Sequence, residues 1–292
     1  MRVAIYGRNQ VRNLEAIAKE VVLNLEKAGA GYIMYSPFKD FLCKTLKTKI
    51  DCPTFKHHSE IKGEVDFLIS IGGDGTLLDT ISLVRDSKIP IIGINAGRMG
   101  FLASIPTEEI EYAIDCLAKG RYDLDHRTLL RLESNQGIFG ELNFALNELT
   151  IHKKETASMI TIHTYLNGEY LNSYWADGLI IATPTGSTGY SLSCNGPIIF
   201  PQSENFVITP IAPHNLNVRP IIVSDKNVIS LEVEGRSKNF MASLDSRSFT
   251  IDSSVQMAVR KENFYISLIR LHDQNFLSTL RQKLMWGLDS RN

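Results

Sequence analysis

The periodicity of apolar residues changes part-way along the chain, and this change limits the folds that are open to it. Before about Tyr122, short apolar runs at residues 2–6, 65–71 and 90–94 alternate with stretches in which apolar residues recur at helical spacing. An alternation of strands and helices predicts an open, mostly parallel α/β sheet. The early part of the chain is therefore predicted to form an α/β domain.

Beyond Tyr122 the chain carries the period-two pattern of antiparallel sheet. Every second side chain between residues 160 and 166 points to one face, and Asn167-Gly168 supplies a two-residue hairpin turn into residues 169–175. More short strand-like runs follow at residues 178–182, 206–211, 220–223, 228–233, 249–251 and 264–268. The sequence therefore predicts a β-rich, sandwich-like second domain over residues 123–269.

The tail returns to helical spacing between residues 274 and 286. We expect this helix to pack back on the first domain. The predicted organisation is thus an α/β domain over residues 1–122, with residues 270–292 packed on it, and a β-rich domain over residues 123–269.

Charge and cysteine content exclude several classes of protein. The net charge of -1 and the pI near 6.7 give no electrostatic footprint for nucleic acid, and no run of about 18 apolar residues predicts a transmembrane helix. The seven histidines lack zinc-site spacing, and the four cysteines form no CxxC pair: Cys43, Cys52, Cys116 and Cys194. We expect a cytoplasmic protein with reduced thiols, no protein-only metal site, and no nucleic-acid or membrane partner.

A buried strand runs directly into Gly72-Gly73-Asp74-Gly75, after which a helix is predicted to begin. Glycine lets a ligand approach the main chain closely, and a helix N-terminus presents unpaired amides to an anion. This is the geometry of a phosphate cradle. Because a carboxylate does not itself bind phosphate, we expect Asp74 to accept a proton from an attacking hydroxyl or to meet a metal. The alternative is a tight turn in which Asp74 caps the helix.

Other nucleotide-binding patterns are absent from the sequence, which has no Walker loop, no GxGxxG after the first strand and no HRD loop. A second glycine-bearing segment, residues 95–102, follows a predicted strand and belongs at the carboxyl edge of the sheet, where α/β folds bind ligands. Its Phe101 is expected to stack on a base or to plug the domain interface. Arg98 is a candidate phosphate contact or a solvated arginine.

Two polar segments in the β-rich part are candidate ligand sites. Asn147 and Glu148 interrupt an apolar strand, and an amide next to a carboxyl group suits ribose hydroxyls and base edges. Residues 177–191 form a buried strand that feeds a loop crowded with glycines and hydroxyls. Such a loop offers donors to a pyrophosphate or a sugar, or simply forms a β-turn. A serine-hydrolase elbow is disfavoured, since GxSxG does not fit around Ser187.

Taken together, these segments resemble the NAD kinase family, which shares its glycine-rich turn with phosphofructokinases and with diacylglycerol and sphingosine kinases. The match extends from about Asp66 to Asp245. It rests on the glycine turn and on further segments that look specifically like NAD kinase: Asn95 to Leu102, Asn147-Glu148, Asp177-Gly178, Thr183-Pro184-Thr185-Gly186-Ser187-Thr188-Gly189-Tyr190 and Arg219-Pro220-Ile221.

The resemblance implies that the terminal phosphoryl group of ATP, or of polyphosphate in some members, is transferred to the 2′-hydroxyl of the adenosine ribose of NAD to give NADP. It implies that the first domain binds nucleotide and the second binds NAD. Asp74 would be the proton acceptor, and Gly72, Gly73 and Gly75 would give access to phosphates. Residues implied to contact or line the NAD site are Phe101, Asn147, Glu148, Asp177, Thr185, Thr188, Gly189, Tyr190, Ser193 and Ala212. Since few basic residues lie in these segments, we infer that Mg²⁺ or another divalent cation bridges the ATP phosphates.

Two details depart from the commonest family pattern. Gly189 stands where many bacterial members carry alanine, and Leu244-Asp245-Ser246-Arg247 replaces a stretch that usually contains Asp-Gly, so a role for Asp245 is open. Two alternative functions remain: a lipid kinase of the diacylglycerol or sphingosine type, although no basic amphipathic stretch is present, and a non-catalytic dinucleotide-binding sensor. The resemblance also suggests a homodimer or homotetramer.

Overall fold

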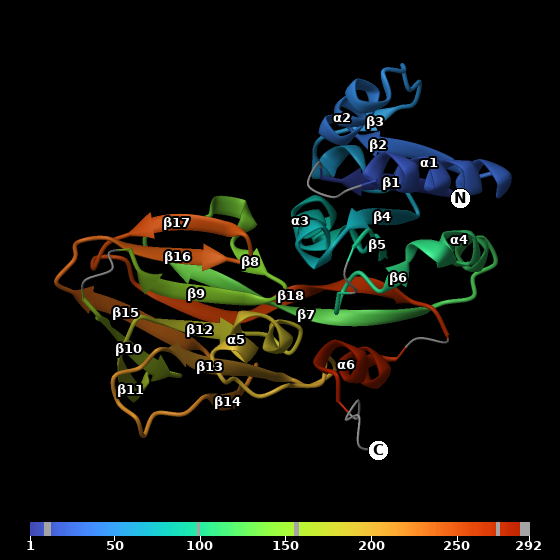
Figure 1. Cartoon of the computed structure of the whole chain (residues 1–292). Coiled ribbons are helices and arrows are strands. Elements are labelled where there is room, and N and C mark those ends of the chain that lie inside the picture. The colour runs from blue at the N-terminus through green and yellow to red at the C-terminus, as the bar shows by residue number, and fades with distance from the viewer. Residues whose placement is uncertain (9–12, 98–99, 155–157, 273–274, 287–292) are drawn as a thin grey trace. The chain divides into compact units, whose positions relative to one another are not determined.

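The computed structural model describes residues 1–8, 13–97, 100–154, 158–272 and 275–286 (Figure 1). The chain divides into two compact units, Met1–His126 with Ile266–Asn292, and Arg127–Tyr265. Two long strands, β7 (Asp123–Ser134) and β18 (Met257–Arg270), contain the residues at which the chain passes from one unit to the other.

The first unit is built on a parallel sheet. Its strands run in the order β5 (Ile91–Asn95), β4 (Phe67–Gly72), β1 (Arg2–Gly7), β2 (Gly31–Tyr35) and β3 (Thr54–Phe55), and every neighbouring pair is parallel. β6 (Ile105–Pro106) and the last part of β18 also pair with β5 in parallel. β4 and β5 are buried along their whole length, as expected for parallel strands that are covered on both faces.

The described residues of this unit form five α-helices: α1 (Leu14–Lys27), α2 (Ser36–Leu46), α3 (Asp74–Val84), α4 (Ile110–Ala118) and α6 (Phe276–Leu284). The apolar sides of α1 and α4 enter one core with the strands, through residues such as Leu14, Val21, Ile114, Ile5 and Ile69. α6 buries Leu280, and its Lys283 ammonium lies 5.6 Å from the centroid of the Phe101 ring. The C-terminal helix that was predicted to pack on the first domain is therefore present in this unit. Gln274 lies outside the described residues.

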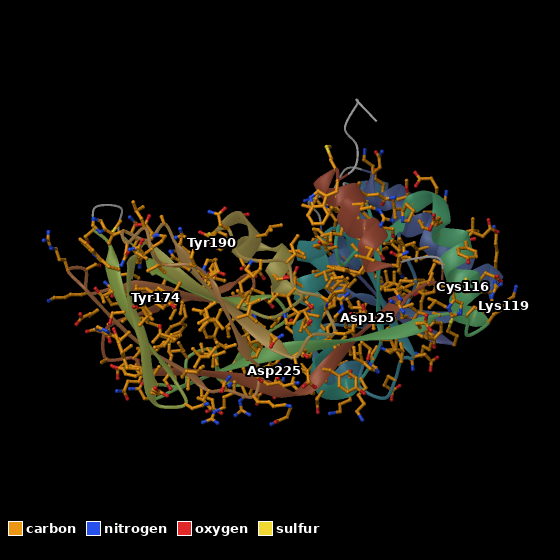
Figure 2. All side chains as sticks on the ribbon, turned by 90° about the horizontal axis from the view of Figure 1, so that it is seen from below. Cys116, Lys119, Asp125, Tyr174, Tyr190 and Asp225 are labelled. Atoms are coloured by element: carbon orange, nitrogen blue, oxygen red, sulfur yellow. The ribbon has the colours of Figure 1, made fainter. Side chains whose placement is uncertain are left out.

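The second unit contains two antiparallel sheets that enclose one core. One sheet has the order β11 (Glu169–Ala176), β10 (Ile160–Leu166), β15 (Ile229–Gly235) and β18, with β7 and β8 (Phe144–Ala145) attached. The other has the order β14 (Ile221–Ser224), β13 (Asn205–Ile211), β12 (Gly178–Ala182), β9 (Glu148–Lys153), β16 (Phe240–Leu244) and β17 (Arg247–Ile251). Buried side chains from both sheets share the core, including Ile162, Tyr174, Phe206 and Phe240; Tyr174 is labelled in Figure 2. The predicted combination of an α/β part and a β-rich, sandwich-like part is confirmed.

Local differences from the prediction have identifiable causes. Asn167 and Gly168 have φ of 53° and 85°, the pair of positive values that a type I′ hairpin turn requires, so the β10–β11 turn is as predicted. The helical spacing of apolar residues predicts a helix over residues 106–118, but α4 begins only at Ile110, because Ile105–Pro106 pairs with β5 before a single 3₁₀ turn. Helix α2 and strands β7 and β16 were not predicted. Among the described residues, no helix is long and apolar enough to cross a membrane.

Candidate functional site

The parallel sheet of the first unit changes its strand order at β1. β2 and β3 lie on one side of β1, whereas β4 and β5 lie on the other. Open α/β sheets bind ligands outside the carboxyl ends of their strands at such a switch point. The carboxyl ends of β1 and β4 lead into Arg8 and into Gly72-Gly73-Asp74, respectively. The glycine turn that was predicted to cradle phosphate thus lies where the topology favours a ligand.

Close packing requires only one of the three glycines in this turn. A Cβ atom on Gly72, whose φ is +156°, would lie 2.3 Å from the Thr76 hydroxyl oxygen. A Cβ atom on Gly73 or Gly75 would meet nothing within 4 Å. Open space therefore lies beside the first residues of α3, where unpaired helix amides favour an anion.

The Asp74 carboxylate holds the loop that follows β5. Its Oδ2 accepts the Phe101 amide at 2.7 Å, and its Oδ1 accepts the amides of Leu102 at 3.0 Å and Ala103 at 2.9 Å. Gly73 occupies the N-cap position of α3, and no side chain caps this helix, so the alternative in which Asp74 is a helix cap is wrong. A carboxylate has about four acceptor positions. The three bonds leave Asp74 able to accept one further donor.

A cation stands at the end of β1. The Arg8 guanidinium forms an ion pair with the Asp79 carboxylate on α3, and the Tyr6 hydroxyl lies 3.3 Å from the same carboxylate oxygen. Burial raises the pKa of Tyr6 to about 12, so this phenol stays a neutral hydrogen-bond donor. Sequence reasoning did not select Arg8, although its position directly after a buried strand was a usable signal. Arg98, the candidate phosphate contact, lies outside the described residues.

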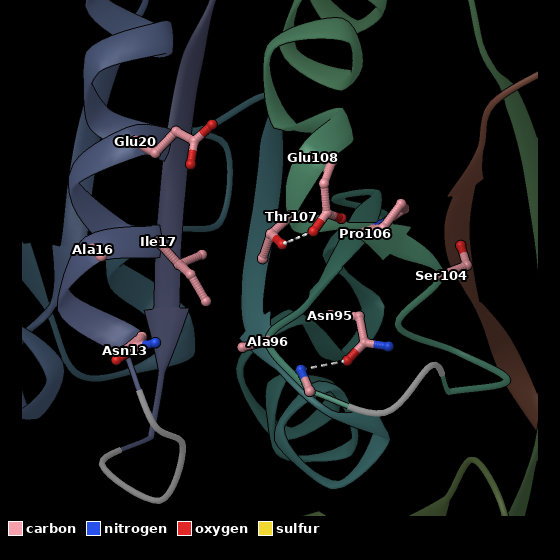
Figure 3. Close-up of a pocket in the computed structure, with 11 residues that line it drawn as sticks. Asn13, Ala16, Ile17, Glu20, Asn95, Ala96, Ser104, Pro106, Thr107 and Glu108 are labelled. Atoms are coloured by element: carbon pink, nitrogen blue, oxygen red, sulfur yellow. Dashed lines mark hydrogen bonds between the residues drawn. The ribbon is translucent and has the colours of Figure 1, made fainter.

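A separate pocket of about 460 Å³ lies between α1 and the segment that follows β5 (Figure 3). The Asn95 carboxamide oxygen accepts the Gly97 amide at 2.9 Å at one side of it. Its lining contains two carboxylates, Glu20 and Glu108, and none of its described lining residues is a lysine or arginine. This charge pattern disfavours phosphate, so the glycine turn remains the candidate phosphate site.

In the second unit, Asn147 and Glu148 lie where the chain crosses from one sheet to the other. β8 ends at Ala145 and pairs with β7, whereas β9 begins at Glu148 and pairs with β12 and β16. The sequence predicted one strand interrupted by two polar residues. The structure instead has two strands in different sheets, and the polar residues occupy the crossing.

The side chains at this crossing carry acceptors that the described residues leave without a partner. Oδ1 of Asn147 and Oε2 of Glu148 are both buried and form no hydrogen bond. A Cβ atom on Gly189 would lie 3.3 Å from that Glu148 oxygen and 3.7 Å from the Asn147 amide nitrogen. Three of the predicted site residues therefore meet. Because a buried acceptor without a partner is costly, the arrangement is suited to a ligand that brings donors.

A pocket of about 380 Å³ lies beside this crossing. Its lining includes the predicted residues Glu148, Asp177 and Tyr190, together with Thr150, His152, Lys153, Ile211, Ser243 and Asp245. The Lys153 ammonium lies 2.6 Å from an Asp177 carboxylate oxygen, so these charges largely balance. Burial, assisted by the neighbouring Asp245, raises the pKa of Glu148 to about 8. Glu148 is therefore mostly protonated at neutral pH. Tyr190 is exposed at the surface and is labelled in Figure 2.

The remaining predicted residues of this unit are distributed around the loop. Thr185 is buried and accepts a hydrogen bond from the Arg127 guanidinium at 3.2 Å, and the Thr188 hydroxyl donates to the Thr185 carbonyl at 3.3 Å. Ser193 is exposed at the end of α5 (Tyr190–Ser193), and neither it nor Ala212 lines the pocket. Ala212 has φ of 43°, a left-handed conformation that costs an alanine about 1–2 kcal/mol. Strain of this kind recurs at functional sites.

Both parts of the chain match family models. Residues 3–122 match the ATP-NAD kinase N-terminal domain, and residues 146–271 match the ATP-NAD kinase C-terminal domain. The chain belongs to the NAD kinase family. An NAD kinase of Cytophaga hutchinsonii is 49% identical over 294 residues, and one of Flavobacterium psychrophilum is 45% identical over the same length; each alignment covers 100% of both chains.

Solved NAD kinase structures share the fold. The yeast NADH kinase complexed with NADH aligns with a TM-score of 0.88 at 22% identity, covering 99% of this chain and 89% of that one. An Archaeoglobus fulgidus NAD kinase in complex with ATP aligns with a TM-score of 0.73 at 24% identity, covering 98% and 99%. The lipid-kinase and sensor alternatives find no support in these comparisons.

The structure shows what the side chain of Asp245 contacts, which the sequence left open. Asp245 lies in the two-residue turn between β16 and β17, has φ of 50° and faces the pocket. Its carboxylate accepts the backbone amides of Leu146, Asn147 and Glu148. A turn aspartate is common and gives no sign of such distant partners, so only its proximity to the family's usual Asp-Gly position was a signal.

Proposed function

We propose that the chain transfers the terminal phosphoryl group of ATP, or of polyphosphate, to the 2′-hydroxyl of the adenosine ribose of NAD and so makes NADP. The match of both halves to the NAD kinase family models carries this proposal. Residues 1–122 with 270–292 form the nucleotide-binding part, and residues 123–269 form the NAD-binding part. The glycine turn at the switch point and the unpartnered acceptors at the sheet crossing support these assignments.

At the NAD end, the chain offers groups that are polar but mostly uncharged. The Asn147 amide and the protonated Glu148 carboxyl group both donate and accept hydrogen bonds, which suits ribose hydroxyls. Because neither carries a negative charge at neutral pH, they do not repel the pyrophosphate of a dinucleotide. The other NAD contacts of the proposal are Phe101, Asp177, Thr185, Thr188, Gly189, Tyr190, Ser193 and Ala212.

At the donor end, the open space beside Gly73 and Gly75 admits phosphate oxygens to the amides of α3. Phosphoryl transfer passes through a loose transition state, so catalysis depends mainly on positioning. The fourth acceptor position of Asp74 orients the attacking hydroxyl and takes its proton.

Mg²⁺ belongs to the proposal as the companion of ATP. The described residues contain no group of three His, Cys, Asp or Glu side chains that would form a metal cage by themselves. Mg²⁺ usually keeps several waters and binds through substrate phosphates and one or two carboxylates, so no such cage is needed. When bound, the cation would neutralise phosphate charge. We expect NADP formation by the purified protein to stop in excess chelator and to return with added Mg²⁺; full activity in chelator would contradict this role.

The proton-acceptor assignment is tested by Asp74→Asn. We expect kcat for NADP formation to fall by about 10²-fold or more while the Kd for NAD, measured by calorimetry, stays within about twofold. Asp115→Asn, on the exposed surface of α4 in the same unit, is the matched control. Turnover of the Asp74 variant within a few-fold of wild type would show that this carboxylate is not the base.

The same assay separates the proposed enzyme from a binding protein, because a sensor would bind NAD without producing NADP. We also propose a homodimer or homotetramer and a cytoplasmic location for the protein. Analytical ultracentrifugation and cell fractionation test these two statements, and a monomer or a membrane fraction would refute them.

A further inference from the structure

The crossing at residues 146–148 removes six backbone groups from the regular ladders of β8 and β9. Buried backbone N–H and C=O groups are almost always paired, so each of the six needs a partner from elsewhere. Two residues supply all of these partners. They are Asp245, in the β16–β17 turn, and Thr183, directly after β12.

Asp245 holds the donors. One carboxylate oxygen accepts the Leu146 amide at 2.9 Å, and the other accepts the amides of Asn147 at 2.9 Å and Glu148 at 3.2 Å. The Asp245 amide in turn donates to the Glu148 carbonyl at 3.1 Å. Thr183 holds the other acceptors, because its hydroxyl donates to the Leu146 carbonyl and its amide to the Asn147 carbonyl at 2.9 Å.

Arg247, at the end of the β16–β17 turn, also binds the chain just before the crossing. The Arg247 guanidinium, two residues after Asp245, donates to the carbonyls of Leu142 and Phe144 and lies 5.6 Å from the Phe144 ring centroid. Asp245 and Arg247 therefore bracket the segment from Leu142 to Glu148. Asp245 is held at φ of 50° to do so, and this is a conformation that aspartate and asparagine tolerate better than most residues.

The bonds also decide which neighbouring carboxyl group carries the charge. Burial raises the pKa of Asp245, but three amide donors and the nearby Arg247 counter this by stabilising its negative form, whereas Glu148 has a buried oxygen without a partner. The proton therefore belongs on Glu148, whose pKa is raised first by burial and then by the charge of Asp245. The other titratable groups that line the pocket are His152, Lys153, Asp177 and Tyr190, of which Lys153 and Asp177 form an ion pair.

We propose that Asp245 is a positioning residue for NAD: it fixes the backbone of Asn147 and Glu148 and keeps the Glu148 carboxyl group as a hydrogen-bond donor. Asp245 itself acts through these two residues. This inference rests on the proposed function, because it assumes that NAD occupies the pocket at the crossing.

Asp245→Asn tests the inference with little disturbance of the turn, because asparagine also tolerates a positive φ. Its amide oxygen can still accept two of the three amides, but its NH₂ group would face the third donor. We expect the peptide spanning residues 146–148 to exchange amide hydrogens at least about tenfold faster, and the Kd for NAD to rise by about tenfold or more. Asp252→Asn, an exposed aspartate beyond the end of β17, is the matched control and should change neither.

The pH dependence separates positioning from general damage. In the wild type, NAD affinity should fall as pH rises through about 8 and Glu148 loses its proton. Without the charge of Asp245, the midpoint of this fall should move to lower pH. Unchanged amide exchange, or an unmoved midpoint, would overturn the inference.

A second pair of variants keeps the test decisive if Asp245→Asn does not fold. Thr183→Val removes the hydroxyl that serves the Leu146 carbonyl, whereas Thr183→Ser keeps it. We expect the valine variant to show faster exchange at residues 146–148 and weaker NAD binding, and the serine variant to resemble wild type; equal behaviour of the two would refute the inference. Failure of the wild type to bind NAD would instead refute the proposed function, while the exchange rates would still report whether Asp245 holds the crossing.

Discussion

Gly100→Ala should damage the first unit through a single methyl group. Gly100 is buried next to the Asp74 carboxylate, and a Cβ atom on it would lie 1.7 Å from Oδ1 and 2.8 Å from Oδ2. A carbon and an oxygen that are not bonded approach to about 3.3 Å. The carboxylate or the loop must therefore move by about 1.5 Å.

A shift of this size would break the bonds that Asp74 makes to Phe101, Leu102 and Ala103. They now measure 2.7 to 3.0 Å and would exceed the range of a hydrogen bond. Hydrogen bonds to a charged group contribute about 1.5–3 kcal/mol each, and water at the partly exposed Asp74 would replace some of this. We expect a loss of about 2–4 kcal/mol in unfolding free energy. Since a displacement of about 1 Å can cost 10²-fold in rate, kcat/KM should fall by about that factor.

Urea unfolding followed by circular dichroism, together with steady-state NADP formation, measures both effects. Gly97→Ala is the matched control in the same segment, because its Cβ atom would meet nothing within 4 Å. A Gly100→Ala protein within about 0.5 kcal/mol of wild type, with activity changed less than about threefold, would refute the reasoning.

Two further predictions concern buried carboxyl groups. The folded pKa of Glu148 is raised from 4.5 to about 8, so its contribution to stability is complete below pH 4.5 and is lost as pH rises to about 8, by at most about 1.4 kcal/mol per pH unit. Because glutamine cannot ionise, the unfolding free energy of Glu148→Gln relative to wild type should rise between pH 4.5 and 8. Solvent at the partly exposed Glu148 reduces the size of this rise. Parallel pH curves for the two proteins would contradict the prediction. Lys261→Met removes the ammonium 2.6 Å from the buried Asp225 carboxylate and should cost about 2–4 kcal/mol in chemical denaturation, whereas the exposed Lys226→Met should cost less than about 0.5. Equal effects of the two lysine variants would show that the buried pair does not stabilise the fold.

The sequence predicted the fold where periodicity and environment agree. β4 and β5 are mostly apolar and buried along their whole length, and the β10–β11 hairpin has its Asn-Gly turn, so these elements were predictable. β18 was predicted only over residues 264–268, because its burial changes along its length. Its first half alternates, whereas residues 266–269 are continuously buried, so no single period describes the strand.

The sequence motifs indicated candidate site residues, but they did not indicate the hydrogen bonds that hold these residues in place. Asn147, Glu148 and Gly189 lie close together in the structure, and all three belong to the segments that carry the family resemblance. The bonds that Asp74 and Asp245 make were not predictable. Both carboxylates bind backbone amides, and an amide is present at every non-proline residue and leaves no mark in the sequence.

The crossing between β8 and β9 couples ligand binding to the stability of the second unit. Asn147 and Glu148 form the joint of the sandwich, with one strand of each sheet attached to it. A ligand bound by their side chains would stabilise the connection between the two sheets. Ligand affinity and thermal stability therefore depend on the same few hydrogen bonds. Substitutions that weaken the hydrogen bonds of this crossing should therefore lower ligand affinity and thermal stability together, even when every atom that touches the ligand is unchanged.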